Sequence, residues 1–184
     1  LADRSMGIDL VPLARYAWST PWVWRPLQVV YGSIPLMLAI AWTAEKSLIM
    51  RRAVVIAAVS GYFFYMLVPA CGPQYAFPGF PWAEIHGSGL VSVSTLYARN
   101  CFPSLHFSWA LLLLINARSN WLRAIMCCFT ILTALGTVLG GEHYVIDLIA
   151  AVPFVIGVQA VSKRWPCMVA ARRVPAWRPV PSDC

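Results

Sequence analysis

The strongest constraint on this chain is a series of long apolar runs separated by short polar breaks. Each run is about 16 to 19 residues long, close to the ~20 that a helix needs to cross about 30 Å of hydrocarbon. A helix can span a bilayer because it satisfies all its backbone hydrogen bonds internally. The pattern therefore predicts an all-α polytopic membrane helix bundle with five transmembrane helices, at residues 26–44, 53–70, 102–117, 121–139 and 144–161.

The composition agrees with a membrane protein. The chain is 60% hydrophobic and only 11% charged, whereas soluble domains average about 25% charged residues. Its net charge of +7 is then better explained by membrane topology than by affinity for nucleic acid, which we do not expect as a partner. Because the chain begins with Leu1, we expect a missing upstream segment with one more helix, six in all.

The two ends of the chain differ from the apolar centre. Residues 1–25 combine tryptophans at 18, 22 and 24 with charges of both signs, which predicts a segment lying at the membrane interface. The mixed charges disfavour the alternative of a basic nucleic-acid patch. Residues 163–184 are rich in arginine and are predicted to be a basic cytoplasmic tail.

The positions of the basic residues predict the topology. If the five helices alternate, the basic breaks at 45–52 and 118–123 fall on the same side as the tail. The positive-inside rule makes that side cytoplasmic. The loop 71–101, together with His106 and His143, then lies on the extracytoplasmic face.

Two short motifs each stand at the head of an apolar run. They are Arg-Asn-Cys-Phe-Pro-Ser-Leu-His at residues 99–106 and Gly-Gly-Glu-His-Tyr-Val-Ile-Asp at residues 140–147. His143 and Asp147 are four residues apart, so a helix places them on one face, where the carboxylate can hold one imidazole nitrogen. The other nitrogen is left free to act as a nucleophile or base. A carboxylate in a membrane segment is costly and points to function.

The order and separation of these motifs resemble the type 2 phosphatidic acid phosphatase (PAP2) superfamily. The resemblance rests on Pro-Ser-x-His at residues 103–106 and His-x-x-x-Asp at residues 143–147. Together with Gly-Pro-Gln-Tyr-Ala-Phe-Pro at residues 72–78, they are most similar to the branch that contains inositol phosphorylceramide and sphingomyelin synthases. Residues 26–162 would then form a PAP2-like transmembrane catalytic domain that acts on a lipid phosphate or phospholipid.

The resemblance also implies roles for individual residues. His143 would attack phosphorus and become a phosphohistidine, Asp147 would orient it, and His106 would protonate the leaving oxygen, with no cofactor. Ser104 is expected to donate to a phosphoryl oxygen or to cap the helix that follows. Tyr144, within the same His-Tyr-x-x-Asp sequence, is a further expected substrate contact.

The chain departs from the phosphatase branch of this family in its cations. The Lys-x6-Arg-Pro motif is missing, and Gly136-Thr137 stands where that branch has a Ser-Arg pair. Arg99 is the best remaining candidate to meet phosphate charge, although it could be an ordinary loop cation. Because few cations are available to bind phosphate, the sequence favours a phosphodiester or diphosphate substrate, and transfer to a lipid hydroxyl over hydrolysis by water.

Three alternatives stay open at this point. His106 and His143 could bind a metal with a carboxylate from Asp147 or Glu142. The ionisable cluster could instead serve as a proton relay in a transporter. Separately, Cys71 and Cys101 bracket the extracytoplasmic loop and could form a disulfide that closes it over the site.

Overall fold

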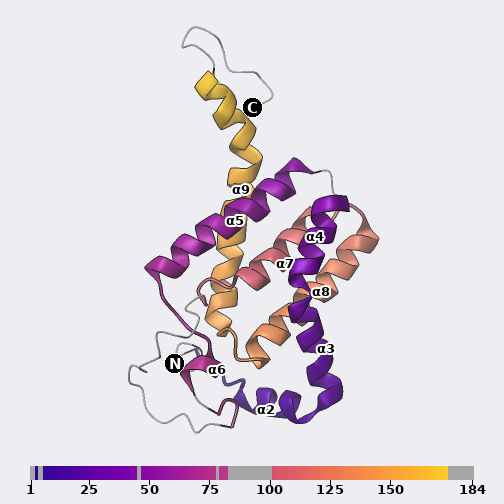
Figure 1. The fold of residues 1–184 in the computed structure, drawn as a ribbon, viewed down its shortest axis with the longest axis vertical. Coiled ribbons are helices and arrows are strands. Elements are labelled where there is room, and N and C mark those ends of the chain that lie inside the picture. Colours follow the sequence, from indigo (N-terminus) through magenta and orange to yellow (C-terminus); the bar gives the residue numbers. More distant parts are fainter. Residues whose placement is uncertain (1–2, 4–5, 45–46, 78, 83–100, 174–184) are drawn as a thin grey trace.

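The computed structural model describes residues 3, 6–44, 47–77, 79–82 and 101–173. This part of the chain is helical and contains no strand. Figure 1 shows the helices gathered into one bundle, with α2 lying across one end and α9 extending beyond the other. The helices are α2 (Val11–Ser19), α3 (Pro21–Gly32), α4 (Ile34–Ala44), α5 (Leu48–Leu67), α6 (Pro73–Ala76), α7 (Leu105–Asn116), α8 (Asn120–Leu139) and α9 (Val145–Arg173).

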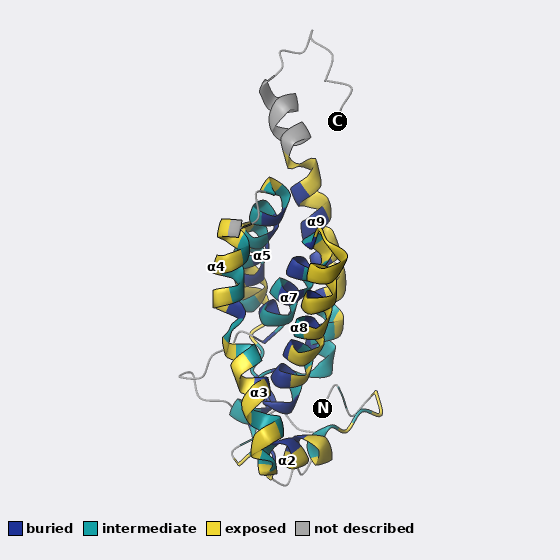
Figure 2. Cartoon of the chain, turned by 90° about the vertical axis from the view of Figure 1, so that its right-hand side faces the viewer, coloured by how far each residue is buried: buried dark blue, intermediate teal, exposed yellow. Residues whose placement is uncertain are grey.

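Three helices, α5, α8 and α9, are long and apolar enough to cross a membrane, with mean hydropathies of 1.4, 1.9 and 2.0. The bent pair α3 and α4 raises the number to four if it is one span. The expected count of five is therefore not confirmed, because α7 has only 12 residues. Figure 2 shows exposed residues along the outward surfaces of the helices. Large apolar residues are among the exposed ones, including Phe63 and Leu67 on α5 and Ile131 on α8. Such a surface fits contact with lipid.

The predicted helix over residues 26–44 contains Pro35, which is expected to kink it, and the structure bends the chain there. The axes of α3 and α4 differ by 43°, and Ser33 lies between them with its amide bonded to the carbonyls of Val29 and Val30. Pro35 explains the break, since proline lacks a backbone N–H and its ring clashes with the carbonyl four residues earlier. That earlier residue is Tyr31, which borders the site described below.

The short helix α7 lies at the centre of the bundle and contacts α4, α5, α8 and α9. Its Leu112 packs in a buried cluster with Ala53 and Ala57 of α5 and with Val155 and Val158 of α9. Small side chains such as alanine let helix backbones approach closely. This packing holds α7 and α9 together, and the two sequence motifs lie at the starts of these helices.

The two ends of the described chain extend the bundle in different ways. α2 packs Ala14 and Ala17 against Leu27 and Leu139, so it covers the end of the bundle where α8 finishes (Figure 1). That residues 1–25 lie at a membrane interface stays a prediction. At the other end, α9 continues past the expected end at residue 161 and through Pro153 to Arg173, which makes the first part of the predicted tail helical.

Candidate active site

The loop between α8 and α9 holds the His143 backbone in place. Gly141 has a φ of +73°, a conformation that glycine adopts readily and other residues rarely. This turn lets the amides of Glu142 and His143 both donate to the Thr137 carbonyl, at 3.0 and 3.2 Å. From the other side, the Gln74 amide of α6 donates to the Gly141 carbonyl at 2.9 Å. The loop is thus fixed by both α8 and α6.

His143 and Asp147 are brought together in the interior. Both residues are buried, with 3% and 2% of their surface exposed, and His143 Nδ1 lies 3.5 Å from Asp147 Oδ2. The same carboxylate oxygen accepts the Tyr144 amide at 2.8 Å. Because Nδ1 faces the carboxylate, Nε2 is the ring nitrogen available for chemistry.

Cys101 takes part in this pair, which the sequence did not predict. Its Sγ lies 2.7 Å from Asp147 Oδ2 and 3.3 Å from His143 Nδ1. Burial, and then the neighbouring Asp147 carboxylate, raise the pKa of the Cys101 thiol, so the protonated thiol donates to Asp147. Neither Cys71 nor Cys101 is in a disulfide bond, so the disulfide considered from the sequence is not formed.

The first motif meets the second through Ser104. Its backbone amide donates to the Asp147 carbonyl at 3.2 Å, while its hydroxyl accepts the Phe107 amide at 3.4 Å and caps α7. His106 follows in the first turn of α7, and the Tyr31 hydroxyl lies 3.4 Å from its Nδ1. The rings of His106 and His143 are 6.2 Å apart between centroids. Both histidines can therefore contact one small group from two sides.

The family comparison gives the same indication as this geometry. A model of the PAP2 superfamily matches residues 1–161. The chain belongs to the PAP2 superfamily. No curated protein and no solved structure matches it. Membership of the PAP2 superfamily, together with the apolar helices, indicates a membrane protein with phosphatase or phosphotransferase activity on a lipid-related substrate.

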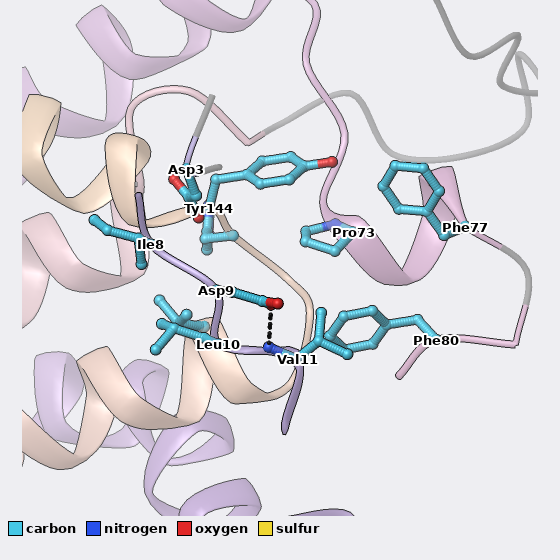
Figure 3. A pocket seen from close by; sticks show the side chains of 11 residues that line it. Asp3, Ile8, Asp9, Leu10, Val11, Pro73, Phe77, Phe80 and Tyr144 are labelled. Atoms are coloured by element: carbon cyan, nitrogen blue, oxygen red, sulfur yellow. Dashed lines mark hydrogen bonds between the residues drawn. The ribbon is translucent and has the colours of Figure 1, made fainter. Parts of the chain in front are cut away.

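One cavity of this PAP2 protein reaches His143 and has a volume of about 70 Å³. Figure 3 shows this His143 cavity, where Tyr144 and the carboxylates of Asp3 and Asp9 lie among apolar side chains. Asp3 accepts the amides of Val145 and Ile146 at the start of α9, at 2.9 and 3.1 Å. The apolar residues that line the His143 cavity are Ile8, Leu10, Val11, Pro73, Phe77, Phe80 and Val138.

A second cavity, of about 240 Å³, borders Tyr31 and thus the His106 side of the site. We call it the Tyr31 cavity. Glu142 forms part of its wall and accepts hydrogen bonds from the Gln74 amide group and from the Tyr75 hydroxyl, the latter at 3.2 Å. One motif histidine thus lines the first cavity, and a residue that contacts the other lines the second. The other lining residues are Trp18, Trp24, Gln28, Gly136 and Gly140.

The remaining residues expected from the sequence have mixed outcomes. Arg99 lies outside the described residues. Tyr144 lines the His143 cavity. In the described part of the chain, the group with metal-ligand spacing consists of Cys101, His143 and Asp147, whose ligand atoms lie within 4.8 Å of one another. It does not include His106 or Glu142, so the ligand sets considered from the sequence are wrong. The nearness of Cys101 to the Pro-Ser-x-His motif was the one feature of the sequence that could have indicated its place in the site.

Proposed function

We propose that this PAP2 protein is a lipid phosphotransferase that works through a covalent phosphohistidine at His143. The observation that carries the proposal is the pairing of the two histidines, with ring centroids 6.2 Å apart. Asp147 and the Cys101 thiol both lie beside Nδ1 of His143. They hold the imidazole so that Nε2 can attack.

The first chemical step forms an N–P bond and breaks a P–O bond. His143 Nε2 attacks the phosphorus of a lipid phosphate ester, and the leaving oxygen takes a proton from His106. The Asp147 carboxylate stabilises the imidazolium character that develops on His143. In the second step His106 removes a proton from an acceptor hydroxyl, whose oxygen attacks phosphorus and releases His143.

The linings of the cavities favour transfer to a lipid hydroxyl. The described residues that line the His143 and Tyr31 cavities include no lysine or arginine. A phosphodiester carries less charge than a phosphate monoester and needs fewer cations. This supports the resemblance to the inositol phosphorylceramide and sphingomyelin synthase branch. Hydrolysis of a lipid phosphate or diphosphate by water is the second candidate, and Ser104, Tyr144 and Arg99 would contact substrate in either reaction.

The proposed site faces the extracytoplasmic side. Lys163 and Arg164 lie toward the end of α9 that is distant from Asp147, and Arg123 lies near the start of α8, distant from His143. Basic residues mark the cytoplasmic side of membrane helices. The catalytic end of the bundle is then the opposite one.

The test uses the full chain reconstituted in vesicles with EDTA present, supplied with lipid phosphates or phosphodiesters, alongside His143→Ala. We expect the wild type to form a new phospholipid without free phosphate, and the variant to form none, since its nucleophile is missing. Free phosphate from the wild type alone would make the protein a phosphatase. Loss of turnover in EDTA would refute the metal-independent mechanism. No product from either the wild type or the variant would favour the transporter alternative.

A further inference from the structure

We propose that Cys101, His143 and Asp147 form a binding site for Zn²⁺, and that the protein is catalytically inactive when this site is occupied. The second half of the proposal rests on the function proposed above. The first half depends only on the structure.

The three ligand atoms are spaced for a tetrahedral metal ion. Cys101 Sγ is 3.3 Å from His143 Nδ1, which is 3.5 Å from Asp147 Oδ2. With Zn²⁺ bonds of about 2.0–2.3 Å, tetrahedral ligand atoms lie about 3.3–3.6 Å apart. The remaining separation, between Sγ and Oδ2, is 2.7 Å, because a hydrogen bond now joins these atoms. It would open by about 0.9 Å when the metal replaces the thiol proton.

The types of ligand select the metal. Thiolate and imidazole ligands favour Zn²⁺ over Mg²⁺ or Ca²⁺, which prefer sets made only of oxygen. Three protein ligands leave the fourth position for water. All three residues are buried, with no more than 3% of the surface of any of them exposed. Surrounding packing therefore already holds them together.

The His143 cavity supplies a route for a cation. Asp3 and Asp9 contribute carboxylates to its lining, and the described lining residues include no lysine or arginine. A cavity lined by one sign of charge concentrates ions of the opposite sign. The cavity also borders His143 itself, so an ion that enters it reaches a ligand of the site.

Metal binding would remove the proposed nucleophile. The thiol of Cys101 gives up its proton to solvent when it ligates the ion. His143 binds through Nδ1, so the proton that Nδ1 carried moves to Nε2. A protonated Nε2 has no lone pair with which to attack phosphorus. The Asp147 carboxylate is at the same time withdrawn from orienting the ring. Zn²⁺ is therefore an inhibitor here and takes no part in the reaction.

The binding test uses Co²⁺ as a spectroscopic probe of the purified full chain in lipid nanodiscs. A thiolate bound to Co²⁺ gives a charge-transfer band in the near ultraviolet, and we expect one Co²⁺ per chain that Zn²⁺ displaces. Cys101→Ser should lose the band, because serine cannot supply a thiolate. Cys127→Ser is the matched control, since Cys127 is an exposed cysteine on α8, and it should keep the band. Melting temperatures establish that each variant is folded.

The activity test measures Zn²⁺ inhibition of the same proteins. We expect EDTA to reverse inhibition of the wild type, and the Zn²⁺ concentration for half inhibition to rise by about tenfold or more in Cys101→Ser. A band that persists in Cys101→Ser, or no band in the wild type, would overturn the site. If Co²⁺ binds as expected but Zn²⁺ leaves turnover unchanged, the inactive state is refuted. The His143→Ala comparison tests the proposed nucleophile separately.

Discussion

Replacing Asp147 by asparagine tests the central electrostatic interaction of the proposed reaction. Asparagine keeps the shape of the side chain and an oxygen that can accept from the Tyr144 amide and the Cys101 thiol, which Asp147 now does at 2.8 and 2.7 Å. The substitution therefore removes the negative charge while leaving the hydrogen bonds. We expect Asp147→Asn to lower kcat strongly and to change KM little, because the charge acts when His143 becomes positive.

The size of the effect follows from the distance between the two groups. At the 3.5 Å that separates His143 Nδ1 from Asp147 Oδ2, opposite unit charges attract by about 4–5 kcal/mol with an effective dielectric constant of about 20. Each 1.36 kcal/mol is a factor of about ten in rate. The expected loss in kcat is therefore about a thousandfold.

The assay is the initial rate of phospholipid formation in vesicles, with the melting temperature of each variant measured in parallel. Asp9→Asn is the matched control, because Asp9 lines the cavity that reaches His143 but its carboxylate accepts only the exposed Val11 amide among the bonds described. It should retain wild-type kcat. A fall of less than about tenfold for folded Asp147→Asn would refute the role given to this carboxylate.

Two further substitutions test how the site is supported. Gly72→Ala should lower the free energy of unfolding by about 3 kcal/mol, because a Cβ there would overlap the Glu142 carbonyl. Thermal melting measures this loss. Gly157→Ala is the tolerated control, because a Cβ at that position meets no neighbouring atom. Tyr31→Phe removes the hydroxyl beside His106 Nδ1 and should reduce kcat about three- to tenfold. Kinetics equal to those of Tyr62→Phe, an exposed residue of α5, would contradict that contact.

Much of the helical architecture could be predicted from the sequence, because apolar runs of membrane length leave few alternatives to a helix. The ends of the helices could not. α9 continues through Lys163 and Arg164, which mark the end of an apolar run but are themselves good helix formers. The bend at Ser33, by contrast, could be predicted, because Pro35 disturbs the turn that precedes it.

The part of the site that depends on local spacing along a helix could be predicted. His143 and Asp147 share a helical face because they are four residues apart. Their meeting with His106 depends on the α7–α8 hairpin, and the alternation of the predicted helices already placed both motifs on one face of the membrane. Cys101 reaches the pair through tertiary packing alone, and no periodicity in the sequence relates residue 101 to residue 147. The cation expected at Arg99 lies outside the described residues.

The length of α9 has a consequence for the lipid in which the protein works. Asp147 and Lys163 are sixteen residues apart on one continuous helix, which corresponds to about 24 Å along its axis. If the lysine stays among the headgroups, the length of the helix fixes the distance between those headgroups and the Asp147 carboxylate. A bilayer with a hydrocarbon core of about 30 Å then places the carboxylate within its outer part. Acyl chain length thereby controls how far a headgroup must move inward to meet His143, so hydrophobic mismatch becomes a regulator of turnover.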